Sequence, residues 1–322
     1  MVLENGYTLG FIGAGNMGTA VLSAAIHGAE QSTVESVPTK FIVSVKSEKS
    51  RQRLRGLFGS NPKVHVVDDN QTVIDESHVV VLAIKPYVVK EVLGRLHYSH
   101  FTVLVSLLAG TSIDTIRQYT SVNAFIVRAT TNTAARIGCG MTALSFQGEY
   151  NPDSPIMMAV EWLFTQTGKY IVVEESKQDT CVALCGSGPA FVHLFTEGLI
   201  DGAVKMGLPF DTARQCAAQV LLGSAQMVLE GGHPSVLKNA ITTPAGTTIN
   251  GLSVLEDGAV RGAVIRAVEK STNVAKQLSE SHEGPSRSIE ASRHASAVNL
   301  AEMAQQISLS RRNTMNRQPT QP

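Results

Sequence analysis

The chain has 322 residues, of which 43% are apolar, 17% are charged and 5% are aromatic. Its 27 basic side chains balance 27 acidic ones, so no overall positive field is available to hold a nucleic-acid backbone, and we expect no nucleic-acid partner. The length suits two domains, since single cores rarely grow beyond about 250 residues. Four cysteines are too few for a disulfide scaffold, so we expect reduced, buried thiols at Cys139, Cys181, Cys185 and Cys216.

Signals for targeting and for membrane insertion are weak. No Lys or Arg precedes Lys40, which argues against a secretory signal and against an Arg-rich presequence. The longest unbroken apolar run covers residues 79–84, whereas a membrane helix needs about 20 such residues. We therefore expect a cytoplasmic protein without a membrane partner.

Between residues 7 and 173, short β-branched runs alternate with helical stretches, which is the pattern of a parallel sheet covered on both faces. The predicted strands are Thr8–Ile12, Phe41–Val45, Val64–Val67, Val79–Ile84, Val103–Leu107, Ala124–Val127, Met141–Phe146 and Tyr170–Val173. The predicted helices are Asn16–His27, Glu48–Phe58, Val88–Leu96 and Ser112–Gln118.

The second half is predicted to be all-helical, because apolar residues recur there at spacings of three and four, as at Leu194, Leu199, Ala203 and Met206. The Ser187-Gly188-Pro189 segment is interpreted as a break that opens a long helix. We place a boundary between residues 167 and 176, which gives domains at 1–173 and 174–280. Residues 281–322 contain no aromatic residue and are predicted to be a disordered tail.

The strongest local motif is the glycine-rich turn that follows the first predicted strand. Gly13, Gly15 and Gly18 form a G-x-G-x-x-G pattern between an apolar strand and a helix. The first glycine permits the tight turn, the second lets a pyrophosphate approach the backbone, and the third lets the helix pack close to the strand. The helix near Asn16 would direct free N–H groups at the phosphates, so the turn predicts dinucleotide binding.

The end of the second predicted strand bears on which dinucleotide binds. An acidic residue there favours NAD, but this chain has Lys46 and Ser47, followed by Lys49 and Arg51. These groups could hold a 2′-phosphate, which favours NADPH over NADH. Glu48 opposes this interpretation, and a solvated charged helix face is the alternative for the basic residues.

The glycine-rich turn and six other motifs, in matching order between Tyr7 and Leu278, resemble the pyrroline-5-carboxylate reductase family, whose members reduce a cyclic imine to proline. The motifs are Phe11–Gly18, Leu82–Pro86, Ser106–Gly110, Arg128–Thr133, Cys185–Ala190, Asp201–Pro209 and Thr243–Thr248. The resemblance implies a Rossmann-type doubly wound domain, a helical C-terminal domain that interlocks with a second copy, and active sites at the dimer interface. It also implies hydride transfer from the nicotinamide to the imine carbon.

The resemblance assigns roles to individual positions. It implies pyrophosphate binding by Gly13, Gly15, Asn16, Met17 and Gly18, and adenosine-phosphate binding by Lys46 and Ser47 with Asp69 or Asn70. It implies nicotinamide-side roles for Ala83, Lys85, Pro86, Ala109, Gly110 and Asn132. It implies binding of the substrate carboxylate by Thr243, Gly246, Thr247 and Thr248.

Elementary chemistry supports the last assignment. Pro244-Ala245-Gly246 is a turn signal, and a helix that starts at Thr247 would offer free N–H groups and two hydroxyls to a carboxylate. An ordinary capped helix is the alternative. A cyclic imine is basic, so solution, a water or Thr248 could deliver the proton. We expect Thr248 and Lys85 to take part in catalysis and positioning to dominate it. No cluster has metal-site spacing, so no metal is expected.

Other functions remain open. Thr130-Thr131 and Val274-Ala275 depart from the family pattern, which leaves room for a paralogue that reduces a substituted or six-membered cyclic imine. A β-hydroxyacid dehydrogenase would need Asn four residues after a catalytic Lys, but Lys205 is followed by Pro209 and Lys177 by Cys181. A non-catalytic dinucleotide-binding protein is the third alternative, and the intact turn at Thr243–Thr248 argues against it.

Overall fold

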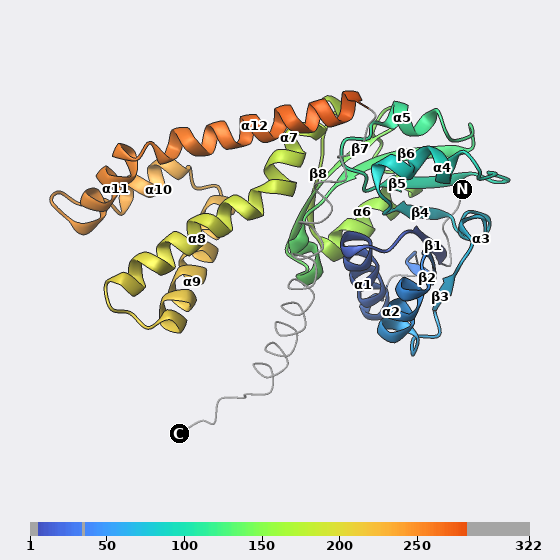
Figure 1. Ribbon diagram of the computed structural model, residues 1–322, viewed down its shortest axis with the longest axis horizontal. Helices are drawn as coiled ribbons and strands as arrows, with labels where there is room; N and C mark the ends of the chain where they lie inside the picture. The colour runs from blue at the N-terminus through green and yellow to red at the C-terminus, as the bar shows by residue number, and fades with distance from the viewer. Residues whose placement is uncertain (1–5, 34–35, 282–322) are drawn as a thin grey trace, which may run out of the picture.

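The computed structural model describes residues 6–33 and 36–281 and shows a sheet domain joined to an extended helical arm (Figure 1). From residue 282 on, the predicted tail lies outside the described residues. The strands are β1 (Tyr7–Ile12), β2 (Pro38–Ser44), β3 (Val64–Val67), β4 (Val79–Leu82), β5 (Thr102–Ser106), β6 (Ala124–Thr130), β7 (Gly140–Phe146) and β8 (Gly168–Val172). All eight predicted strands are therefore confirmed, with ends that shift by up to three residues.

The strands form one sheet in the order β3-β2-β1-β4-β5-β6-β7-β8. The predicted all-parallel pairing is wrong at one place, because β6 and β7 are antiparallel. Only residues 131–139 connect these two strands, and a parallel crossover needs about a dozen residues or more. Strand β8 returns parallel to β7 after a full helix.

Helices cover both faces of the sheet, as the sequence predicts. They are α1 (Asn16–Gln31), α2 (Glu48–Phe58), α3 (Asn70–Glu76), α4 (Val89–Leu93), α5 (Ile113–Arg117) and α6 (Pro155–Thr167). Leu22 of α1, Leu54 of α2 and Phe164 of α6 pack on one face, against Leu9 and Phe11 of β1. Helices α3, α4 and α5 pack on the other face around Ile12 and Leu82. Alternate strand residues thus enter two separate cores, which is the doubly wound arrangement.

Two of these helices have no counterpart among the predicted elements. Helix α3 has seven residues and begins where the Asp69 side chain accepts hydrogen bonds from the N–H groups of Gln71 and Thr72. Helix α6 begins with Pro155 directly after Ser154 and is apolar over most of its surface. The first is too short for periodicity to show, and the second carries too few polar residues to mark a face.

The arm consists of helices alone: α7 (Gln178–Cys181), α8 (Gly188–Lys205), α9 (Phe210–Leu229), α10 (Pro234–Ala240), α11 (Thr247–Asp257) and α12 (Val260–Ser281). The predicted start of a long helix at Gly188-Pro189 is confirmed, but the segment is no break, because a π-helical segment at Val182–Ser187 joins α7 to α8 without interruption. Pro189 has no N–H for the carbonyl of Cys185, four residues earlier. Asn132 Nδ2 donates to that carbonyl at 3.0 Å instead.

The apolar stripes of the arm are exposed in the single chain. Leu194 is 71% exposed, Leu222 is 63% exposed and Leu229 is 80% exposed, and no residue of α8, α10 or α11 is buried. The expectation that all four cysteines are buried is wrong, since Cys139, just before β7, and Cys216, in α9, are both exposed. None of the described helices is both long and apolar enough to cross a membrane.

A buried polar joint fixes the arm to the sheet. Arg128 of β6 is 3% exposed and its Nη2 lies 2.7 Å from Asp179 Oδ1, which also accepts from Ser279 Oγ of α12. Gln178 is fully buried, accepts from Thr130 Oγ1 and donates to Ser145 Oγ. Because the groups are paired, burying them is tolerable, and the joint sets the direction of the arm.

Replacing Asp179 with Ala is expected to lower the free energy of unfolding by about 3 kcal/mol, because Arg128 is then buried with only the Glu175 carboxylate, 3.6 Å away, to balance it. Urea unfolding at a fixed protein concentration measures the change. The control is Asp211→Ala, which breaks an exposed pair with Arg214 and should change the value by less than about 1 kcal/mol. Equal effects of the two substitutions would contradict the role of the joint.

Candidate active site

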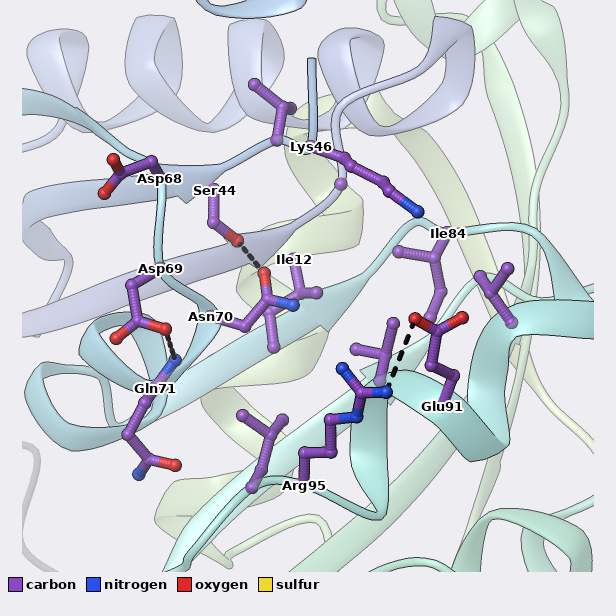
Figure 2. A pocket seen from close by; sticks show the side chains of 15 residues that line it. Ile12, Ser44, Lys46, Asp68, Asp69, Asn70, Gln71, Ile84, Glu91 and Arg95 are labelled. Carbon is purple, nitrogen blue, oxygen red and sulfur yellow. Dashed lines mark hydrogen bonds and ion pairs between the residues drawn. The ribbon is translucent and has the colours of Figure 1, made fainter.

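A cavity of about 430 Å³ lies at the carboxyl edge of the sheet, where the loops after β1, β2, β3 and β4 meet. Figure 2 shows its lining side chains and the Lys46 side chain extending across it toward Ile84. The crevice outside the carboxyl ends of the strands is where open α/β sheets bind ligands. Its size suits a nucleoside-sized group.

The glycine turn has the geometry that the sequence predicts. Gly13 has φ +85°, and a Cβ there would lie 2.7 Å from the carbonyl oxygen of Ala83. A Cβ on Gly18 would lie 2.7 Å from the Ala83 Cβ, so this glycine allows α1 to pack against the end of β4. Gly15 has no atom within 4 Å of such a Cβ and faces open space. Gly13 and Gly18 are therefore needed for packing within the protein, whereas packing does not require the glycine at position 15.

The start of α1 offers unpaired donors beside that open space. Gly15 is the N-cap residue and no side chain caps the helix. Within the described residues, the N–H groups of Gly15, Asn16 and Met17 donate to no other group of the chain. Such a helix start, with its positive dipole end, suits a pyrophosphate.

Of the residues predicted on the adenosine side, Lys46, Asp69 and Asn70 line this cavity, whereas Ser47 does not. Ser47 caps α2, accepting from Ser50 N–H, and Lys46 precedes it. The side-chain Oδ1 of Asn70 accepts from Ser44 Oγ at 2.6 Å, whereas Asp69 caps α3 (Figure 2). The hydrogen bonds from Gln71 and then Thr72 hold the pKa of Asp69 below its usual range, so it stays an anion. A phosphate is therefore better matched by Lys46, Ser47 and the α2 N-terminus than by Asp69.

The predicted nicotinamide side surrounds the ends of β4 and β5. Strand β4 ends at Leu82, and Ala83, Lys85 and Pro86 follow it, with the Lys85 side chain exposed. Gly110 has φ +64°, and a Cβ there would lie 3.1 Å from Leu278 Cβ of α12. Ala109 is exposed beside it, so this loop borders both the sheet domain and the arm.

Asn132 is used differently from its neighbours. Its Nδ2 donates to Cys185 and its Oδ1 accepts from the N–H of Ala134. Both ends of the amide thus hold the arm and a short turn in place, and the side chain is 7% exposed. Both polar groups of the Asn132 side chain are therefore already hydrogen-bonded within the protein.

The predicted carboxylate turn is formed in the arm, far from the cavity. Helix α11 begins at Thr247 as predicted, its N-cap is Gly246 and no side chain caps it. A Cβ on Gly246 would lie 2.3 Å from Thr243 Oγ1, so a larger residue there would displace the Thr243 side chain. Figure 1 shows α11 at the end of the arm remote from the sheet. One chain therefore does not bring Thr243, Thr247 and Thr248 to its own cofactor cavity.

Comparison with known proteins identifies the family. Residues 175–278 match the family described as pyrroline-5-carboxylate reductase dimerisation, and residues 8–110 match NADP oxidoreductase coenzyme F420-dependent. A pyrroline-5-carboxylate reductase of Lophium arboricola is 38% identical over 309 residues, covering 86% of this chain and 95% of the relative. One from Schizosaccharomyces pombe is 35% identical, covering 83% and 97%.

The chain belongs to the pyrroline-5-carboxylate reductase family. A solved structure of 1-pyrroline-5-carboxylate reductase from Streptococcus pyogenes is 28% identical with a TM-score of 0.74, and covers 85% of this chain and 100% of its own. The pyrroline carboxylate reductase of Plasmodium falciparum with NADP bound has the same TM-score at 26% identity, covering 86% and 100%. The matched dimerisation region, residues 175–278, coincides with the helical arm.

Two contacts of this fold could not be recognised in the sequence, although Arg51 itself is predicted there as a candidate for holding a 2′-phosphate. Arg51 donates to the carbonyls of Val45 and Lys46 and so fixes the turn that carries Lys46. Gln178 holds the joint of the arm from a fully buried position. Arginines at every second position of α2 give no sign of which one turns inward, and a lone Gln carries no periodicity.

Gly15→Ala is expected to separate cofactor binding from folding. The added methyl group meets no protein atom, so the free energy of unfolding without cofactor should change by less than about 1 kcal/mol. It occupies the approach to the free N–H groups, so the Kd for NADPH should rise at least about 10-fold, in line with one or two lost hydrogen bonds to a charged group. Fluorescence titration and urea unfolding measure the two effects. Unchanged affinity would contradict the assignment of the turn.

Proposed function

We propose that the protein is an NADPH-dependent reductase that converts 1-pyrroline-5-carboxylate to L-proline, with residues 1–173 as the dinucleotide domain and 174–280 as the dimerisation and substrate domain. The observation that carries the proposal is the pairing of two anion-receiving helix starts in one family member. The α1 start in the sheet domain suits the pyrophosphate, and the α11 start in the arm suits a substrate carboxylate.

The sheet-domain residues fit a dinucleotide. The free N–H groups of Gly15, Asn16 and Met17 would receive the pyrophosphate, and the cavity between Ser44 and Asn70 would take the adenosine. Lys46 and the Ser47-capped start of α2 would receive a 2′-phosphate, which supports NADPH over NADH. Ala83, Pro86 and Gly110 would border the nicotinamide, which supplies a hydride to the imine carbon when bound.

The arm residues fit the substrate carboxylate. The N–H groups at Thr247 and Thr248 lie at an uncapped helix start, and Asn250 Nδ2 donates to the carbonyl of Gly246 at 2.9 Å, which stiffens the turn. A helix start of this kind holds a carboxylate without an arginine. The Thr248 hydroxyl would then face the ring nitrogen and could supply a proton to it as the hydride reaches the imine carbon.

The active site is proposed to be shared between two copies of the chain. The arm of one chain carries α11 away from its own sheet, and its apolar residues need another surface to bury them (Figure 1). A second copy would cover these residues, and it would bring its own Thr243–Thr248 turn to the cofactor cavity of the first. One contact between two copies would thus bury the apolar residues of the arm and complete the active site.

The assay for the proposed function is oxidation of NADPH with 1-pyrroline-5-carboxylate, beside substituted and six-membered cyclic imino acids and a 3-hydroxyacid with NADP. Thr248→Ala is expected to lower kcat/KM for the pyrroline carboxylate at least about 10-fold, because it removes a hydroxyl that contacts an ionic substrate. Thr272→Ala, on α12, is the control, since its hydroxyl only bonds back to the helix. Turnover of the hydroxyacid alone would contradict the function.

Lys46→Ala is expected to raise the KM for NADPH about 10-fold and to leave the KM for NADH within about twofold, since only NADPH carries the 2′-phosphate that this ammonium group would meet. Steady-state kinetics with both cofactors provides the measurement. Lys63→Ala, which removes an exposed lysine that does not line the cavity, is the control. A parent enzyme that prefers NADH would contradict the assignment.

A further inference from the structure

We propose that Arg53 is a positioning residue that sets the orientation of the pyrophosphate-binding turn. The inference deepens the proposed function and rests on it, since it concerns how the turn at Gly13–Gly18 presents donors to the cofactor. Arg53 stands in the middle of α2 and belongs to none of the motifs that mark the family in this sequence.

The contacts of Arg53 converge on one backbone carbonyl. Its Nη2 donates to the carbonyl oxygen of Ala14 at 2.5 Å. The Thr19 hydroxyl donates to the same oxygen at 2.9 Å, and both guanidinium Nη atoms lie 3.3 Å from that hydroxyl oxygen. The carbonyl of Ala14, between Gly13 and Gly15, is thus held by one donor from α2 and one from α1.

Peptide geometry turns this anchoring into a statement about the cofactor. In a trans peptide, the carbonyl of one residue and the N–H of the next point in opposite directions. Fixing the Ala14 oxygen toward Arg53 therefore directs the N–H of Gly15 away from Arg53, and within the described residues that N–H donates to no other group. Because glycine peptides rotate easily, the turn needs such an anchor to keep the donor aimed before the ligand arrives.

The charge environment of Arg53 supports the same role. The neighbouring arginines Arg51 and Arg55 lie within ion-pair distance of Glu48, whereas Arg53 forms no ion pair in the part of the chain that the structure describes. Burial and then the positive charge of Arg136 lower the pKa of Arg53 from its usual value, so the guanidinium group that donates to Ala14 lies in a partly desolvated place beside the turn.

The proposed role differs from 2′-phosphate binding in a measurable way. A residue that orients the pyrophosphate donors affects NADPH and NADH alike, because both contain the pyrophosphate. A residue that touches the 2′-phosphate affects NADPH alone. The ratio of the two affinities therefore distinguishes the two roles.

The experiment compares Arg53→Met, which keeps the apolar stem and removes the donors, with Arg53→Lys and with Arg55→Met as the control on the same helix. Loss of one charged hydrogen bond should raise the Kd values for NADPH and NADH by a similar factor, about 3- to 10-fold. At saturating NADPH, kcat and the KM for the imine should stay within twofold of the parent, and Arg53→Lys should recover part of the affinity. Thr19→Val combined with Arg53→Met should weaken binding less than the product of the single effects, since both act on one carbonyl.

Unchanged Kd values in a folded Arg53→Met protein, or a change confined to NADPH, would overturn the inference. A fall in affinity equal to that of Arg55→Met would overturn it as well, because charge alone would then explain the effect. A parent that binds both cofactors but reduces no cyclic imine would remove the proposed substrate and leave this test of Arg53 intact. A parent that binds neither cofactor overturns both proposals.

Discussion

The constraint on which the rest of the structure depends is the inability of one chain to bury the apolar stripes of its own arm. Leu194 and Leu222 recur at helical spacing on α8 and α9, yet both are largely exposed. Leaving such continuous apolar surface in water is costly, at about 25 cal/mol for each Å². The turn at Thr243–Thr248, which we propose binds the substrate carboxylate, also lies at the end of the arm that is remote from the sheet of its own chain. In the proposed dimer a second copy resolves both problems, so that assembly and catalysis depend on the same contact.

The direction of the arm matters because it decides where the partner's turn arrives. Arg128 and Gln178 set that direction through buried hydrogen bonds, and Asn132 adds a brace to the helix at Cys185. Catalysis by positioning needs such rigidity, since about 1 Å of misplacement can cost two orders of magnitude in rate. The zero net charge of the sequence is compatible with the two anionic ligands that we propose, because helix starts and Lys46 would receive them locally.

Much of the fold follows from the sequence because the sheet is buried on both faces and its strands are continuous β-branched runs, as at Val79–Leu82. The glycine turn and the start of α11 were equally predictable, since each depends on residues adjacent in sequence. The antiparallel β7 depends on the length of a connection, and the π-helical segment before Pro189 depends on Asn132, which is distant in sequence. Which arginine of α2 reaches the turn depends on how helix and strand pack. Local patterns carry no record of such tertiary contacts.

The most direct test of the shared site mixes two defective subunits. Gly15→Asp would place a carboxylate where the pyrophosphate binds, and Thr248→Asp would place one where the substrate carboxylate binds, so each homodimer should be inactive. Co-expression with two different tags allows the heterodimer to be purified. If the cavity of one chain is completed by the turn of the other, one of its two sites is intact and the heterodimer should have about half the activity of the parent. An inactive heterodimer would contradict the account, because each site would then be formed within a single chain.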